Sequence, residues 1–525
     1  MAVRIYTTRA GSELCPAEVS LLRRLVDERG RAALIAPSFA EADVCRHDLA
    51  RAGVALGVDY ATPARWTDAL WGLLGDGRRM VDNLERQLVI SDMLFRRTPE
   101  ELAPLGNTPG TVRMLGRMAR DLLPGIAGTA AGRASAVPAV LYAGESAAEK
   151  KVAELLRAYA DALDCRGLVE PSEAAEVLAA STSAQLPACA RTVVVRGVTS
   201  WSHSFLRLLG AVAVAGGDVH ILLACEQAAC VDDLSAALEA LGAAVSRSEL
   251  GEGDGPAVAD DDAVPSCVPR LLEVSGPHAR ARAYTDAIEA LVDGVPASRP
   301  QDGVGAAPVP RVLVVAPDAA GLFAELAPRL AVRGMTAAAT DFVPFGRTAV
   351  GGRFTALADL AECMKDAEEG RAAKAEWWPA PELTDWIYSP VSGADAARAR
   401  QFDKNMRLSR AKTVDGVMSL LQSIQGQVRS DRKKLDADHP LKNVPCVVYD
   451  VFQAIWRAQP VKALKAMLSV AEALPDRSFG SADGQVRREA ELAHARRAVQ
   501  VLTETTRELD VSQASAVPVL AGVRV

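Results

Sequence analysis

The sequence lacks paired cysteines, clustered histidines and long apolar runs. Its nine cysteines form no C-x-x-C pair, and its six histidines are equally dispersed, so we expect no metal site. The longest apolar stretches are interrupted, as by Gly216, Gly217 and Asp218, so we expect no membrane span. Scattered thiols with no signal peptide before them predict buried, reduced cysteines in a cytoplasmic protein.

Positive charge is also scarce. Lys plus Arg is 59 and Asp plus Glu is 66, which gives a net charge of −7. A wholly basic nucleic-acid-binding domain is therefore not expected, although a local basic groove remains open. The composition that is present, 49% hydrophobic and 24% charged over 525 residues, is that of a globular chain with several folded units.

Hydrophobic patterning predicts a parallel α/β protein. Short apolar strands alternate with amphipathic helices near the start, helical periodicity alone follows, and strands then resume. The predicted strands are residues 3–6, 32–36, 58–61, 192–195, 219–223, 271–274, 311–315 and 518–525. The predicted organisation is a first sheet domain at 1–70 and 187–245, an all-helical insertion at 71–186, a linker at 246–268, an incomplete second sheet domain at 269–354 and 515–525, and a second helical insertion at 355–514.

A loop that could bind phosphate follows the first strand and precedes a helix, and it consists of Arg9, Ala10, Gly11 and Ser12. Phosphate-binding loops use glycine N–H groups, a lysine and a Ser or Thr that holds Mg²⁺. Here Leu14 and Cys15 occupy the lysine and Ser/Thr positions, and the chain has no Gly-Lys dipeptide. An ordinary strand-to-helix turn is the alternative interpretation.

The same loop resembles the opening of the B subunits of AddAB (RexAB) helicase–nucleases, relatives of superfamily-one helicases. Further stretches are similar in the same order along most of the chain, namely residues 34–38, 49–53, 60–71, 159–171, 193–201, 278–283, 312–316, 345–348 and 386–393. The resemblance implies two RecA-like (P-loop NTPase-like) domains with helical insertions. It also implies a dead ATPase, because Glu13 would repel a triphosphate and the strand ending at Val198 lacks an Asp-Glu pair.

The function that the resemblance implies is that of a DNA-binding scaffold subunit in double-strand-break processing for recombinational repair. Its partners would be DNA, as a duplex end or single strand, and a helicase–nuclease A subunit. The family's PD-(D/E)XK nuclease and iron–sulfur site would lie beyond residue 525. We therefore expect no catalytic residue, no metal and no ATP or Mg²⁺ in this segment. Two acid-x-Lys triplets, at 149–151 and 431–433, fall in predicted helices and are attributed to chance.

A basic run could contact DNA phosphates through Arg429, Arg432, Lys433 and Lys434, with a solvated helix face as the alternative.

Three other features have plainer interpretations. Ser202 before His203 predicts a helix N-cap. The tryptophans at 377, 378 and 386 predict core packing rather than base stacking. The acidic residues 260–262 predict a solvated linker.

Two further functions remain open. Two α/β domains also describe a transferase that binds a nucleotide sugar between two Rossmann-like halves. Long helical insertions are not required by that architecture, and the chain has no Gly-x-Gly-x-x-Gly motif. The other alternative is an interaction scaffold that makes no contact with DNA.

Overall fold

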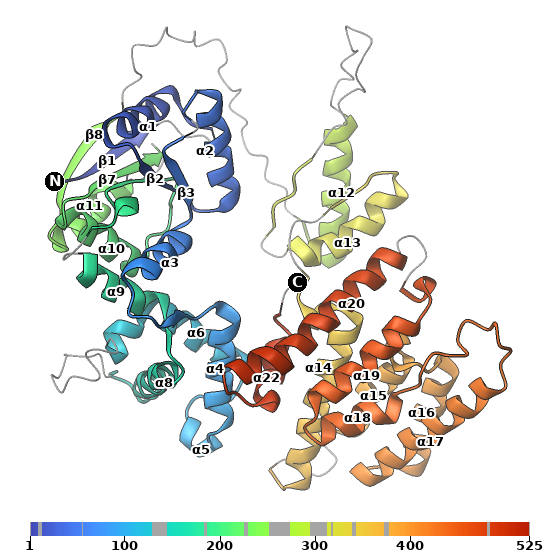
Figure 1. Ribbon diagram of the computed structural model, residues 1–525. Helices are drawn as coiled ribbons and strands as arrows, with labels where there is room; N and C mark the ends of the chain where they lie inside the picture. Colours follow the sequence, from blue (N-terminus) through green and yellow to red (C-terminus); the bar gives the residue numbers. More distant parts are fainter. Residues whose placement is uncertain are drawn as a thin grey trace. The chain divides into compact units, whose positions relative to one another are not determined.

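The chain divides into two compact units. In the computed structural model, the described residues are 2–8, 13–54, 56–128, 144–182, 186–224, 229–250, 274–293, 312–316, 319–338, 343–371, 377–479 and 484–523. The first unit, called here the sheet unit, comprises Met1–Val258 together with Leu502–Val519 (Figure 1). The second, called the helical unit, comprises Ala259–Val501 together with Leu520–Val525.

A six-stranded parallel sheet forms the centre of the sheet unit, with the strand order β3-β2-β6-β7-β1-β8. Its strands are β1 (Ala2–Thr8), β2 (Ala32–Ile35), β3 (Val58–Ala61), β6 (Thr192–Arg196), β7 (Asp218–Ala224) and β8 (Ala244–Glu249). Every neighbouring pair is parallel, which confirms the predicted α/β fold. Strand β8 begins before the predicted linker and runs into it. Its side chains are mostly exposed, as suits an edge strand.

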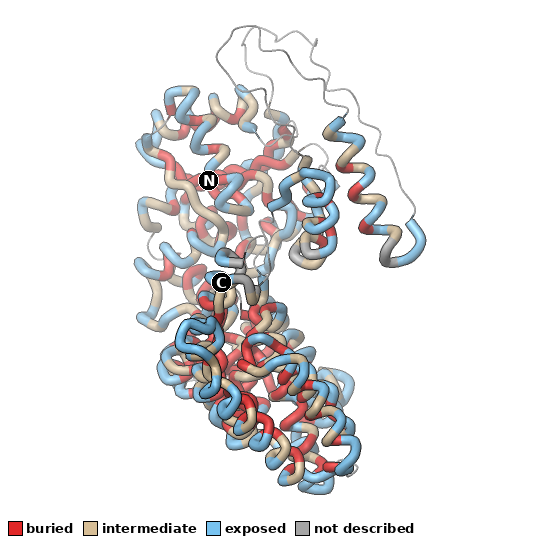
Figure 2. Tube along the Cα trace, turned by 90° about the vertical axis from the view of Figure 1, so that its right-hand side faces the viewer, coloured by how far each residue is buried: buried red, intermediate tan, exposed pale blue. Residues whose placement is uncertain are grey.

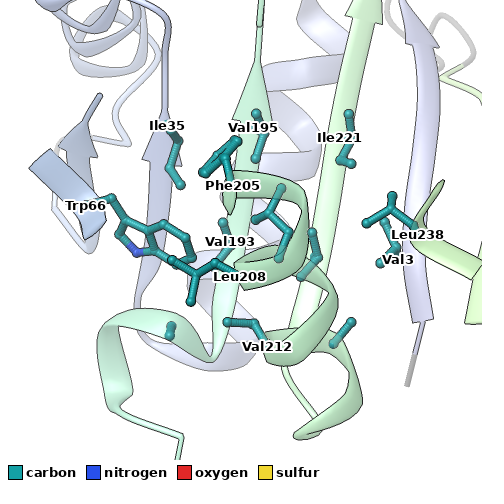
Figure 3. Close-up of a cluster of buried hydrophobic side chains, with 14 of the residues drawn as sticks. Val3, Ile35, Trp66, Val193, Val195, Phe205, Leu208, Val212, Ile221 and Leu238 are labelled. Carbon is teal, nitrogen blue, oxygen red and sulfur yellow. The ribbon is translucent and has the colours of Figure 1, made fainter. Parts of the chain in front are cut away.

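Helices cover both faces of this sheet (Figure 1). The right-handed crossover rule places α1 (Pro16–Arg29) and α2 (Phe39–Arg51) on one face, and α10 (His203–Val214) and α11 (Val231–Ala240) on the other. Side chains alternate accordingly. Val193 and Val195 pack in the cluster of α10, drawn in Figure 3, and Val194 packs in the cluster of α1 and α2.

Burial on both faces explains why the strands are continuously apolar (Figure 2). Trp66 and Phe205 meet edge to face, with ring centroids 6.2 Å apart, where α3 (Pro63–Leu74) joins the α10 face. This contact joins the helices that follow β3 and β6.

Helices dominate the chain between β3 and β6. After α3 they are α4 (Asn83–Phe95), α5 (Pro99–Leu102), α6 (Pro109–Ala127), α8 (Ala147–Asp164) and α9 (Pro171–Thr182), followed by a 3₁₀ turn at Ala188–Ala190. The all-helical prediction is wrong at one point, because β4 (Arg79–Met80) pairs in parallel with β5 (Leu168–Val169). Two residues are too few to produce a periodic pattern in the sequence.

The segment Leu502–Val519 returns to the sheet unit and carries α21 (Thr506–Glu508) and α22 (Gln513–Leu520). The buried Asp92 carboxylate accepts hydrogen bonds from the Ser512 amide at 2.9 Å and the Ser515 hydroxyl at 3.0 Å. These contacts fix the start of α22. The predicted final strand is therefore wrong over Pro518–Leu520, which ends this helix.

The helical unit contains the remaining helices. They are α12 (Pro277–Asp293), α13 (Ala319–Val332), α14 (Ala349–Glu368), α15 (Pro381–Tyr388), α16 (Ala396–Ser409), α17 (Val414–Lys433), α18 (Val448–Trp456), α19 (Pro460–Ala473) and α20 (Gly484–Gln500). Short 3₁₀ turns lie at Phe345–Arg347, Pro390–Ser392 and Asp476–Phe479, and a π-helical turn at Val501–Thr505 follows α20.

The second sheet predicted for this unit is not formed by its described residues. Val312 and Val314 pack against α12 and α13, while Leu313 and Val315 are 87% and 80% exposed. The alternation is that of a strand. However, no described strand lies beside the segment to share its backbone hydrogen bonds. Residues 271–273 of another predicted strand lie outside the described residues.

Cysteine burial differs from the prediction. Cys45 and Cys446 are buried, whereas Cys165 and Cys230 are exposed free thiols.

Of the helices that the structure describes, none combines the length and the apolar character needed to cross a membrane.

Candidate functional site

The carboxyl ends of β1, β2 and β6 form the edge at which open parallel sheets place their ligands. After β2 the chain continues into α2, and after β6 it continues into α10 on the opposite face. Connections that diverge in this way leave a crevice between neighbouring strands. The candidate loop residues Arg9, Ala10, Gly11 and Ser12 belong to this edge in sequence, between β1 and α1, but they lie outside the described residues.

A buried ion pair lies at this edge. Arg196 is the last residue of β6, and Glu18 lies in the first turn of α1. The Arg196 Nε donates to Glu18 Oε1 at 3.2 Å and to Oε2 at 3.3 Å. Glu18 is 1% exposed and Arg196 is 7% exposed, so both charges are removed from water. A buried charge without a partner destabilises the folded state. The opposite charges of Glu18 and Arg196 therefore offset the cost of burying each other.

Further hydrogen bonds connect the pair to neighbouring parts of the chain. Glu18 accepts from the Thr8 hydroxyl at 3.2 Å and from the Cys15 amide at 2.9 Å. Arg196 Nη2 donates to the Glu13 carbonyl at 2.8 Å. The Glu18 carboxylate thus joins the end of β1, the start of α1 and the end of β6.

Burial and this ion pair shift several pKa values. Burial lowers the pKa of Arg196, but the Glu18 carboxylate outweighs it, so the net pKa is raised. Burial raises the pKa of the Cys45 thiol, although Arg196 opposes the shift. The pKa of Cys15 is also raised, first by burial and further by the charge of Glu18. Both thiols are therefore kept protonated rather than activated as nucleophiles.

The described residues of this edge do not fit a Mg²⁺-bound triphosphate. A phosphate-binding loop supplies a lysine, but here Leu14 stands in that position, and its amide donates to Asp48 Oδ2 at 3.0 Å. The charge of Arg196 is neutralised by Glu18, and the Glu18 carboxylate would repel a phosphate beside it. We therefore derive no hydrolytic step at this edge.

Sequence reasoning missed the pairing of Glu18 with Arg196. It considered Arg196 only as part of a strand end. Two signals were available. An acid three residues after a helix N-cap is the pattern of a capping box, and Arg196 is a lone charge ending an apolar strand. Neither signal indicates that the two residues meet.

The basic run lies at the C-terminal end of α17, and its two arginines make ion pairs or hydrogen bonds with other residues of the helical unit. Arg429 pairs with Asp450 at 2.7 Å and donates to the Cys446 carbonyl at 3.2 Å. Arg432 donates to the Val444 and Gly393 carbonyls. Burial lowers the pKa of Arg432. These contacts join α17 to α18 and to the loops at Gly393 and at 444–446.

Of the two lysines of the run, only Lys434 has its ammonium near a carboxylate of the described residues. Lys434 lies 3.5 Å from Asp431, and the Lys433 carbonyl accepts from Lys442 Nζ at 3.0 Å. Asp431 in turn pairs with Arg398. The structure therefore brings the four basic residues together on one helix end, but interleaves them with carboxylates.

The other sequence candidates take structural positions. Ser202 caps α10, accepting from the Phe205 amide at 3.3 Å, which confirms the predicted N-cap. Trp386 is fully buried and donates to the Val448 carbonyl at 3.1 Å, which confirms core packing. The acid-x-Lys triplets lie on α8 and α17, both helices as predicted. Residues 260–262 lie outside the described residues.

Within the part of the chain that the structure describes, no group of three or more His, Cys, Asp or Glu could hold a metal ion. Comparison with known proteins adds no assignment, because no family model matches the chain and no curated protein matches it.

Proposed function

We propose that the chain is a helicase-like, ATPase-dead scaffold subunit that binds DNA in a helicase–nuclease complex. The observation that carries the proposal is the Glu18–Arg196 pair at the carboxyl edge of a parallel sheet. Nucleotide-binding folds place a phosphate at the start of the helix that follows a strand, whereas here a carboxylate of the chain lies in the first turn of α1. The DNA ligand and the partner subunit in this proposal are taken from the sequence resemblance to the B subunits of AddAB helicase–nucleases.

The proposal includes a motor partner. A subunit without hydrolysis needs a second chain that hydrolyses ATP, which we take to be a helicase–nuclease A subunit. The complex would act on duplex ends or single strands during recombinational repair, in the cytoplasm. Nuclease chemistry would come from residues beyond 525 or from the partner.

The experiment is a titration of a fluorescent tailed duplex with the full chain, at low and high salt, with and without ATP and Mg²⁺. We expect binding that weakens steeply with salt and ignores ATP. Saturable binding of a nucleotide sugar without DNA binding would refute the proposal in favour of the transferase. Failure to bind DNA both alone and with the A subunit would favour a scaffold without DNA contact.

A further inference from the structure

Helix α6 presents a row of arginines on one face. Arg113, Arg117 and Arg120 follow each other at intervals of four and three residues, and all three are exposed. Residues at this spacing share one side of a helix. The apolar residues of α6 are buried on a different side, among them Leu115 and Leu123. The arginine row is therefore a solvent-facing surface of the sheet unit.

These arginines are poorly neutralised by the described residues. Arg117 has no ion pair or hydrogen bond of its side chain with any of them, and Arg113 donates only to the Pro109 carbonyl of its own helix, at 3.2 Å. Arg120 contacts its sequence neighbour Asp121 at 3.4 Å. The first turn of α6 also carries no acidic residue.

Several other arginines of the chain meet carboxylates. Arg97 pairs with Glu154 at 2.9 Å, and Arg333 pairs with Asp286 at 2.9 Å. Like charges at spacings of three and four destabilise a helix. Among the described residues, only Arg120 of this row meets a carboxylate, that of its neighbour Asp121, so the row is suited to an anion supplied by another molecule.

We propose that the arginine row of α6 binds the phosphate backbone of a nucleic acid. A helix rises about 1.5 Å per residue, so Arg117 and Arg120 lie roughly 6 and 10 Å along the axis from Arg113. Successive phosphates of one strand are spaced about 3.4 Å along the duplex axis, so these separations match about two and three phosphate steps when α6 runs along that axis. Guanidinium groups bind phosphates through paired hydrogen bonds.

This inference rests on the proposed DNA-binding function and names its surface. It moves the contact away from the basic run of α17, whose arginines are engaged with Asp450 and with backbone carbonyls. A local row of charge also removes the conflict with a net charge of −7, because phosphate contacts depend on nearby charges rather than on the total.

The test compares two matched triple variants of the full chain. The first is R113Q/R117Q/R120Q, in which glutamine keeps helix propensity and removes charge. The control is R400Q/K404Q/R407Q, which removes three charges at the same spacing from exposed positions of α16. There Arg407 pairs with Asp403 at 3.1 Å within the same face. Circular dichroism and the melting temperature establish that both variants remain folded.

We expect the α6 variant to bind a tailed duplex at least about tenfold more weakly, and the slope of log K against log salt to fall by up to about 2.7. The α16 control should bind as the wild type does. If the wild type binds DNA and the α6 variant binds equally well with an unchanged slope, the α6 surface is refuted while the proposed function stands.

Other outcomes are equally decisive. If the wild type binds no DNA, the proposed function fails before the surface is tested. If both triple variants lose the same affinity, general charge rather than α6 is responsible, and the assignment is overturned. If polyglutamate competes as well as DNA at equal charge, the partner is an acidic polypeptide and not a nucleic acid.

Discussion

His220 should make the sheet unit unstable in acid. It lies in the middle of β7, fully buried, and stacks on Tyr6 of β1 with ring centroids 5.9 Å apart. Neither ring nitrogen has a hydrogen-bond partner among the described residues. Burial lowers the pKa of His220 to about 4, and the positive charges of Arg4 and Arg24 contribute in the same direction, while Asp218 opposes them.

The sign and size of the effect follow from the two pKa values. The unfolded chain binds a proton at about pH 6.5 and the folded chain only at about 4. Stability from a neutral His220 is therefore complete above pH 6.5 and is lost as the pH falls toward 4. The full loss is about 3 kcal/mol, and roughly 2 kcal/mol of it is lost by pH 5.

The assay is hydrogen–deuterium exchange of β1 and β7 peptides in a urea series at pH 7 and pH 5, for the wild type and for His220→Phe. Phenylalanine keeps the stack on Tyr6 and removes the titration. Other groups that titrate contribute equally to both proteins, so the difference isolates His220. We expect the variant to lose about 2 kcal/mol less between the two pH values. Equal losses, or an imidazole NMR titration near pH 6.5, would refute this reasoning.

Two further changes test the interior contacts. Glu18→Ala leaves Arg196 buried without its carboxylate and should lower the free energy of unfolding by about 3–5 kcal/mol. Adding Arg196→Met should restore part of that loss in a urea titration, and a double variant as unstable as the sum of the singles would contradict the coupling. At Gly393, with φ +71°, a Cβ would lie 2.0 Å from the Pro445 carbonyl oxygen, so Gly393→Ala should cost more than about 1 kcal/mol. Gly334→Ala, with φ +74° and open space, is its control in thermal unfolding, and equal losses would show that backbone strain alone is responsible.

The first sheet could be predicted because its pattern is local. Strands such as Thr192–Arg196 are apolar at consecutive positions, since helices cover both faces, and they alternate with amphipathic helices. Edge strand β8 was missed because it buries little and is correspondingly polar. The segment at 312–315 has strand alternation in the structure, but pairing depends on a neighbouring strand, which a local pattern does not supply.

Long-range contacts account for most of what the sequence did not reveal. Asp92 and Ser512 are 420 positions apart, and their hydrogen bond belongs to the return of Leu502–Val519 to the sheet unit. Glu18 and Arg196 are 178 positions apart. The basic run illustrates the converse. Its charges were visible in the sequence, but the sequence did not show that Arg429 pairs with the carboxylate of Asp450.

The buried pair also balances charge at the carboxyl edge of the sheet. The N-terminus of a helix favours an anion, through its free N–H groups and its dipole. In a phosphate-binding loop the ligand supplies that anion and a lysine balances it. Here Glu18 supplies the negative charge in the first turn of α1, and Arg196 supplies the positive charge from the end of β6. Glu18 and Arg196 thus balance each other's charge within the chain. Placing a lysine at Leu14 would therefore leave the Glu18 carboxylate beside it, which would repel a phosphate.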